Sequence, residues 1–211
     1  MFKHNLNTKL FFIKVFFISF IICLTSYAES TKLFNNSIVI GSDSAPVKIK
    51  IFSSLTCPHC ANFHTKIVPE LKKNYVETGK VQLIFVDFPL DQAALNASVL
   101  LHCVEQKKQM SLLDAIYNNQ DKWTAGANIN EINNNLKNIV EDLGISSAKF
   151  DACLKDETIV DKILTERISG DKKYATNATP TIIINEKKLE GSASFKNIMK
   201  KNRKAYLIYG I

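Results

Sequence analysis

The chain has 211 residues, of which 46% are hydrophobic and 22% charged, and it carries a formal charge of +7. This length predicts one or two domains, and the composition is that of a globular protein, which excludes a disordered or collagen-like chain. Three of the lysines lie in the first 28 residues, so the remainder holds 24 basic and 20 acidic residues. Because these charges are interspersed, we expect a solvated mixed surface and no nucleic-acid partner.

Residues 1–28 have the pattern of a secretory signal peptide. Lysines precede an apolar run at 15–24, and the small residues Ser26 and Ala28 follow it, which is the usual order of such signals. The 15 mostly apolar residues from 10 to 24 are short for a bilayer span of about 20 residues. We therefore expect export into an oxidising compartment, with an uncleaved membrane anchor as the alternative.

The next part of the chain predicts two buried strands joined by a helix. Residues 47–52 alternate and end in an apolar pair, whereas residues 81–88 form the nearly continuous apolar run of a buried parallel strand. Between them, an apolar stripe at helical spacing begins near Pro58. Pro69 should kink or interrupt this helix, and Gly79 should end it.

Residues 91–174 carry helical patterns, and a β-branched strand follows at 181–185. We expect a turn at 186–187, a short strand at 188–190 and a terminal helix that opens at Ser194. This order predicts an α/β fold with a small mixed sheet, in which one right-handed βαβ crossover precedes an antiparallel hairpin. The helical block is then an insertion, which we expect to cap one end of the sheet.

Cys57 and Cys60 frame a Cys-Pro-His-Cys motif at the predicted start of the first helix. Pro58 suits the first turn, and residues three apart share a face, so the two sulfurs can close a small disulfide ring. The Cys57 sulfur should face unpaired backbone N–H groups and the positive end of the helix dipole. Both favour the thiolate, as would a protonated His59. The pKa of cysteines in such positions ranges down to ~3.5 from ~8.5 in a free thiol.

A stable thiolate makes the disulfide a strong oxidant, because the reduced form is favoured. Cys57 should form the mixed disulfide with a substrate, and Cys60 should remain more buried. One alternative is a structural disulfide, although so short a ring restricts little chain entropy. Another is a zinc site with His59 and His64, although His59 should point away from the face that His64 shares with the cysteines.

The chain resembles the DsbA-like thiol:disulfide oxidoreductases of the bacterial periplasm. The resemblance rests on four stretches spread over the chain: Ala45-Pro46-Val47, Ser54-Leu55-Thr56-Cys57-Pro58-His59-Cys60, Phe88-Pro89-Leu90-Asp91 and Ala178-Thr179-Pro180-Thr181. It implies a thioredoxin fold, formed by residues 29–90 and 175–211, with an all-helical domain inserted at 91–174. It also implies a cis bond between Thr179 and Pro180 beside the cysteine pair, where the Thr179 backbone would bind an extended substrate segment.

The resemblance further implies an enzyme that introduces disulfides into exported proteins in the periplasm, acting on reduced or unfolded substrates. A DsbB-like membrane protein would reoxidise it, and neither a cofactor nor a metal is expected. One alternative is a disulfide isomerase or reductase on the same fold. Another is a copper-handling thioredoxin-like module, for which His102 is the available distant histidine.

Two positions depart from the pattern of many relatives. Where those carry a buried acidic residue in the first strand and a basic partner on the next, this chain has Ile51 and Val86. Replacing both members of a buried pair by apolar groups can be neutral or stabilising. The departure argues against a proton relay to Cys60 through a buried carboxylate. The neighbouring Lys50 and Asp87 should point to the opposite face of the sheet.

Cys103 and Cys153 lie on apolar helix stripes in the predicted insertion. In an exported chain they suggest a second, structural disulfide, with two buried thiols as the alternative. Cys23 would leave with the signal peptide, so the remaining number of cysteines is even. Trp123 and the aromatic residues near it are expected to belong to the core.

Overall fold

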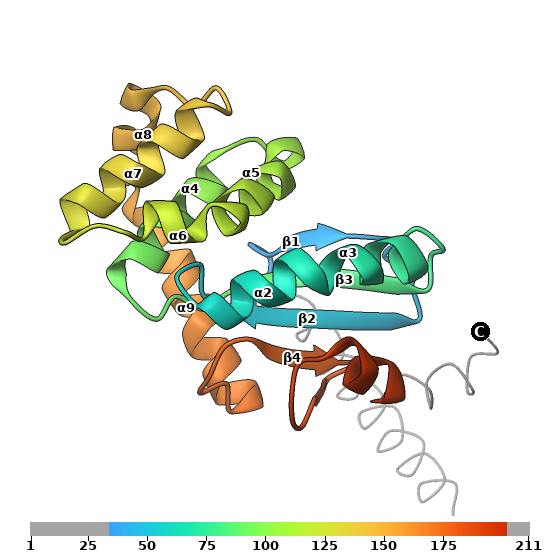
Figure 1. Cartoon of the computed structure of the whole chain (residues 1–211). Coiled ribbons are helices and arrows are strands. Elements are labelled where there is room, and N and C mark those ends of the chain that lie inside the picture. Colours follow the sequence, from blue (N-terminus) through green and yellow to red (C-terminus); the bar gives the residue numbers. More distant parts are fainter. Residues whose placement is uncertain (1–33, 202–211) are drawn as a thin grey trace, which may run out of the picture. The chain divides into compact units, whose positions relative to one another are not determined.

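The computed structural model describes residues 34–201, in which five strands form a single mixed sheet (Figure 1). The strands are β1 (Ile38–Ile40), β2 (Val47–Ser53), β3 (Val81–Asp87), β4 (Thr181–Ile184) and β5 (Lys187–Lys188). Their order across the sheet is β1-β3-β2-β4-β5, with β2 and β3 parallel and the other pairs antiparallel. The predicted signal peptide at residues 1–28 lies outside the described residues.

β2 and β3 are parallel, as the sequence predicted, and they lie side by side within the sheet. Six of the seven residues of β3 are buried, because helices cover both faces of a central parallel strand. The three-residue strand β1 was not predicted. It pairs antiparallel with β3, with Ile38 opposite Phe85, and is too short to show a periodic pattern.

The C-terminal hairpin turns one residue earlier than the sequence suggested. The expected turn at 186–187 lies instead at Asn185 and Glu186, and β5 begins at Lys187. Both turn residues have positive φ, 43° and 67°. A two-residue hairpin of this kind needs positive φ at both positions, and Glu gives no such signal in a sequence.

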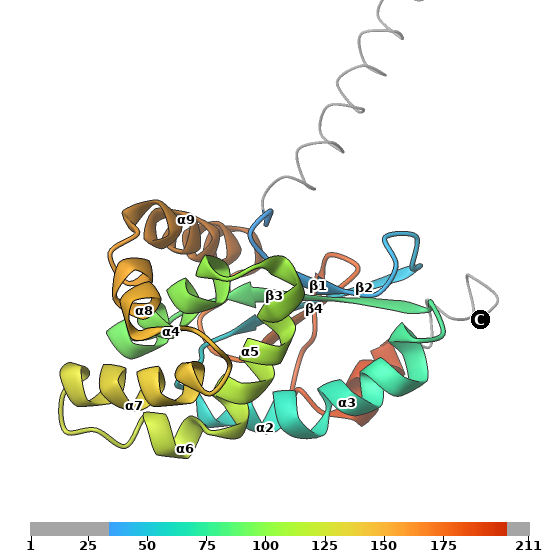
Figure 2. The same cartoon turned by 90° about the horizontal axis from the view of Figure 1, so that it is seen from above.

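Helices cover both faces of the sheet (Figure 2). α2 (Pro58–Lys66), α3 (Val68–Leu71) and the helix at 195–201 lie on one face, and α9 (Glu157–Tyr174) lies on the other. The break between α2 and α3 falls at Ile67, two residues before Pro69, and a π-helical turn (Lys72–Val76) follows α3. The expected interruption by Pro69 is therefore confirmed.

The remaining helices lie between β3 and β4 in the chain: α4 (Gln92–Cys103), α5 (Gln106–Asn118), α6 (Gln120–Trp123), α7 (Ile129–Glu141) and α8 (Ser147–Cys153). We call α4–α9 the helical block. Trp123 is fully buried in it and donates from Nε1 to the Ile116 carbonyl at 3.0 Å, so it belongs to the core as expected. Within residues 34–201, no helix is long and apolar enough to cross a bilayer.

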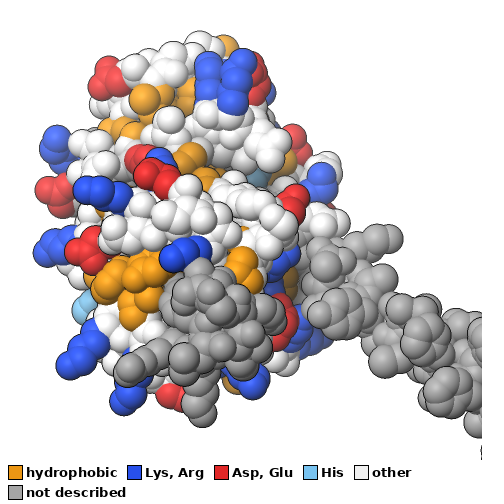
Figure 3. All heavy atoms as spheres, turned by 90° about the vertical axis from the view of Figure 1, so that its right-hand side faces the viewer, with side chains coloured by type: hydrophobic (Ala, Val, Ile, Leu, Met, Phe, Trp, Pro, Cys, Tyr) orange, Lys and Arg blue, Asp and Glu red, His pale blue; other side chains and the backbone are white. Residues whose placement is uncertain are grey.

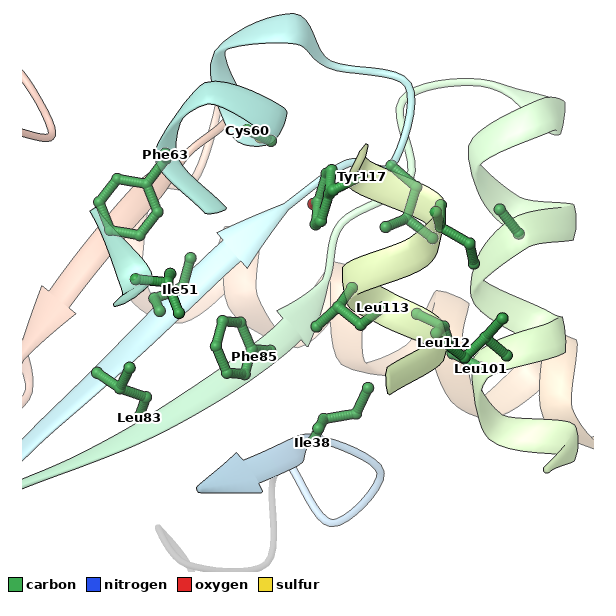
Figure 4. Packing of buried hydrophobic residues seen from close by; sticks show 14 of the residues in the cluster. Ile38, Ile51, Cys60, Phe63, Leu83, Phe85, Leu101, Leu112, Leu113 and Tyr117 are labelled. Carbon is green, nitrogen blue, oxygen red and sulfur yellow. The ribbon is translucent and has the colours of Figure 1, made fainter. Parts of the chain in front are cut away.

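The core is continuous from the sheet into the helical block. Phe63 of α2 packs over Ile51 and Leu83 of the sheet, and leucines of α4 and α5 extend the same cluster (Figure 4). At the surface, lysine and arginine side chains are interspersed with aspartate and glutamate on the face that Figure 3 shows.

Candidate active site: a cysteine pair at the start of α2

Cys57 is the residue that precedes α2, and its backbone is extended there (φ −78°, ψ 118°). Pro58 occupies the first helical position, where a backbone N–H would have no partner within the helix. The Cys57 N–H donates to the Ser54 carbonyl at 3.1 Å, and the Cys57 carbonyl accepts from Cys60 and Ala61 at 3.0 and 3.1 Å. The chain thus turns directly from β2 into the helix, with Cys57 at the corner.

The two thiols have different surroundings. Cys57 is partly exposed, whereas Cys60 is only 1% exposed, and the two are not bonded to each other in this structure. A hydrogen bond from the Cys60 thiol is the main cause that lowers the pKa of Cys57 to about 5, and burial opposes it. Thr179 and the backbone N–H groups of Cys60 and His59 lower this pKa further. Burial raises the pKa of Cys60, so the thiolate of the pair lies on Cys57 and Cys60 holds its proton.

The pairing of β4 with β2 places Thr179 and Pro180 beside Cys57. β4 runs antiparallel to β2, with Thr181 opposite Phe52, so the residues before β4 lie beside the residues after β2. The Thr179–Pro180 peptide bond is cis, as the resemblance implied. The Cys57 Sγ lies 3.4 Å from the Thr179 carbonyl oxygen, to which the thiol form donates.

The Phe88-Pro89-Leu90-Asp91 stretch also reaches this loop. Asp91 caps α4 by accepting from the Ala94 N–H at 2.8 Å, and its other oxygen accepts from the Thr56 hydroxyl at 2.6 Å. The Leu90 N–H donates to the Ser54 hydroxyl oxygen at 3.3 Å. The loop before Cys57 is therefore held by the segment that enters the helical block.

The histidines do not converge on the cysteines. His59 is exposed on the first turn of α2 and contributes its backbone N–H. His64 is buried and bonded through Nε2 to Asp114 at 2.7 Å, and His102 is bonded through Nε2 to Asp87 at 2.5 Å. Among residues 34–201, no three His, Cys, Asp or Glu side chains cluster in a way that could hold a metal ion. No observation on these residues favours the zinc or copper alternatives.

The two positions that depart from the family pattern, Ile51 and Val86, lie in the apolar core. Ile51 and Val86 are 2% and 1% exposed. Lys50 forms an ion pair with Glu186, and Asp87 accepts from the Ser98 hydroxyl at 2.6 Å. Each of the neighbouring charged residues thus has a partner of its own.

The structure contains the disulfide between Cys103 and Cys153 that their context suggested. It joins the last residue of α4 to the last residue of α8, and the Cα atoms are 5.8 Å apart. Cys153 is 1% exposed. This bridge is internal to the helical block and has a structural rather than a catalytic setting.

Sequence reasoning missed a buried acid, Glu166 of α9. Its side chain accepts from the Asn36 N–H at 2.7 Å, and burial raises its pKa to about 7. The Asp87 charge raises this pKa further, whereas the Asn36 bond and His102 lower it. The pKa of His102 is also raised, because the Asp87 charge and hydrogen bond outweigh the effect of burial. The sequence signal that could have revealed Glu166 is an acidic residue on the apolar face of a helix.

We expect the oxidised protein to lose stability as the pH rises from 5 to 8. A carboxyl whose pKa is higher in the folded state binds more protons there, so its contribution favours folding at low pH and declines through about pH 7. A histidine with a raised pKa acts in the same direction. Allowing for partial solvent screening, Glu166 should account for roughly 1–2 kcal/mol. Using the oxidised form removes the titration of Cys57.

Urea denaturation of the oxidised protein and its Glu166→Gln variant at several pH values measures this effect. The variant should show a flatter pH profile, whereas Glu190→Gln, at an exposed position, should retain the wild-type profile. Identical profiles for wild type and Glu166→Gln would show that Glu166 does not titrate in this range.

A pair of free cysteines at the start of a helix, beside a cis-proline loop on this mixed sheet, defines a DsbA-like protein of thioredoxin fold. A family model described as Thioredoxin matches residues 34–201, and the chain belongs to the thioredoxin family. In structure it is similar to α-DsbA1 of Wolbachia pipientis, with a TM-score of 0.72 and 30% identity over 82% of this chain and 92% of that one.

Two curated relatives add to this likeness. A probable disulfide bond formation protein D of Bacillus cereus is 30% identical over 159 residues, which are 69% of this chain and 68% of the relative. A putative protein-disulfide oxidoreductase of Rickettsia bellii is 29% identical over 166 residues, which are 76% of this chain and 61% of the relative. The chain thus spans about three fifths of the length of that Rickettsia relative.

Proposed function

We propose that this protein is a periplasmic thiol:disulfide oxidoreductase that introduces disulfides into exported proteins. The observation that carries the proposal is the asymmetry of the cysteine pair: a partly exposed Cys57 with a pKa lowered to about 5, beside a buried Cys60 with a raised pKa. A reduced form stabilised in this way makes the corresponding disulfide oxidising. The names of the relatives and of the Wolbachia neighbour agree with this class of activity.

The reaction begins from the Cys57–Cys60 disulfide. A substrate thiolate attacks the Cys57 sulfur, the bond to Cys60 breaks, and the Cys60 thiolate takes up a proton because its pKa is raised. A second substrate thiolate then attacks the substrate sulfur of the mixed disulfide. Cys57 leaves as a stabilised thiolate, so two electrons have passed from the substrate to the cysteine pair.

Substrate and reoxidant are the partners of this cycle. An extended segment of a reduced or unfolded exported protein would pair with the backbone of Thr179, which lies beside the Cys57 sulfur. A DsbB-like membrane protein would take the two electrons and restore the disulfide. The predicted signal peptide at residues 1–28 supports the exported location.

Titration of the reduced protein tests the thiolate on which this proposal rests. Ultraviolet absorbance of the thiolate should rise with a midpoint near pH 5, and it should be missing in a Cys57→Ser variant. Cys60, buried and with a raised pKa, should not contribute in this range. A midpoint near 8.5, the value of an ordinary thiol, would overturn the proposal.

The direction of exchange needs a second assay, because an isomerase or reductase could use the same cysteine pair. An oxidase should oxidise a reduced dithiol peptide rapidly and rearrange a scrambled disulfide substrate slowly. The reverse order of rates would assign the protein to the isomerases.

A further inference from the structure

The helical block holds the loop before Cys57 through a buried glutamine. Gln120, the first residue of α6, is 8% exposed. Its Nε2 donates to the Leu55 carbonyl at 2.7 Å and to the Cys57 carbonyl at 3.1 Å. One amide group from a helix more than sixty residues away in sequence thus uses both of its N–H donors on the active-site loop.

Tyr117 lies three residues before Gln120 and acts on the same loop. Its hydroxyl is 3.5 Å from the Ser54 carbonyl oxygen, and its ring stacks on His64 of α2 with the centroids 4.7 Å apart. Figure 4 shows Tyr117 on the side of the core where Cys60 lies. The carbonyl groups of Ser54, Leu55 and Cys57 therefore all have partners on α5 and α6.

These bonds matter differently in the two redox states. In the disulfide form, the covalent bond between Cys57 and Cys60 closes the first turn of α2 by itself. In the dithiol form no covalent bond does so, and no side chain caps the helix at Cys57. The Cys57 thiolate then accepts mainly from the Cys60 thiol, and the backbone N–H groups of Cys60 and His59 add to this stabilisation only while they remain directed at the sulfur. A donor that fixes the Cys57 peptide unit keeps them in place.

We propose that Gln120 is a positioning residue that stabilises the reduced state of the Cys57–Cys60 pair more than the oxidised state, and so makes the pair more oxidising. Tyr117 assists it at Ser54. This inference rests on the proposed function, because it concerns the same redox pair. Its test compares the redox equilibrium of a variant with that of the wild type, so the substrate need not be known.

Equilibration of Gln120→Met with glutathione tests the proposal. In this exchange the protein disulfide and two glutathione thiols give the protein dithiol and one glutathione disulfide, so the equilibrium constant reports the relative stability of the two states. Methionine keeps the volume and removes both donors. The constant should shift toward the protein disulfide by about two- to tenfold, the range that one net hydrogen bond produces. Gln106→Met, at an exposed position of α5, should leave it unchanged.

Thermal unfolding separates this role from a purely structural one. Gln120→Met should lower the midpoint of the reduced protein more than that of the oxidised protein, and thiolate titration should show a raised pKa of Cys57. An equal loss in both forms with an unchanged glutathione constant would overturn the proposal.

Tyr117→Phe provides a second variant that keeps the ring and its stacking on His64 while removing one hydroxyl. It should shift the glutathione constant in the same direction and by less, because Ser54 is further from the sulfur. If Gln120→Met does not fold, an unchanged constant in Tyr117→Phe overturns the proposal. A wild-type protein that fails as an oxidant would reject the proposed function, whatever the variants do.

Discussion

Cys57→Ala will abolish disulfide exchange, and Cys60→Ala will accumulate mixed disulfides. The partly exposed Cys57 carries the thiolate, so its loss removes both the nucleophile and the sulfur that substrates attack. In Cys60→Ala, the Cys57 thiolate can still attack a disulfide peptide and release one peptide thiolate, but no second thiol resolves the complex. Mass spectrometry under non-reducing conditions, with a disulfide-linked peptide in excess, measures the adduct.

The adduct should amount to nearly one peptide per Cys60→Ala chain and should be only transient in the wild type. The double variant Cys103→Ala/Cys153→Ala serves as the control and should exchange disulfides at the wild-type rate. Exchange by Cys57→Ala at a rate above that of free glutathione would mean that another group is the nucleophile.

Removal of the Cys103–Cys153 bridge should lower the free energy of unfolding by about 4 kcal/mol. The two residues are 50 positions apart, so the bridge restricts a long loop of the unfolded chain. It also joins the ends of α4 and α8, which meet in the core of the helical block. Urea denaturation of Cys103→Ala/Cys153→Ala and of the wild type, both with Cys57–Cys60 oxidised, gives the difference.

Denaturation in excess reductant is the matched control, because it opens the bridge in the wild type and should bring the two proteins to similar stability. The glutathione equilibrium constant of Cys57–Cys60 should be the same in both proteins. A stability difference below about 1 kcal/mol would mean that the bridge constrains the unfolded chain far less than its loop length predicts.

The parts of the site that the sequence predicted are those encoded by neighbouring residues. Pro58 marks the first turn of a helix, and the following apolar stripe defines its buried face, so the position of Cys57 at the corner was readable. The same holds for the interruption of the helix by Pro69. The cis bond at Thr179–Pro180 came from family resemblance, because no local pattern distinguishes it from the trans form.

Features that depend on partners distant in the sequence could not be predicted from it. Gln120 looks like an ordinary polar residue of a helix, and the position of Glu166 on an apolar helix face does not identify its partner. Only the folded chain brings Gln120 to the Cys57 loop and Glu166 to Asn36. The short strand β1 forms by pairing with the edge of β3. The hairpin at Asn185 and Glu186 requires positive φ at both residues, which a glutamate in the sequence does not indicate.

The sequence by itself thus determined the order of strands and helices from β2 onward, the helical insertion and the cysteine pair at a helix start, because hydrophobic periodicity and proline act over a few residues. Tertiary structure alone decided how acidic Cys57 is and how well Cys60 keeps its proton. Those properties depend on burial, on the amide groups that surround the sulfur and on donors from the helical block, all of which are brought together only when the chain folds.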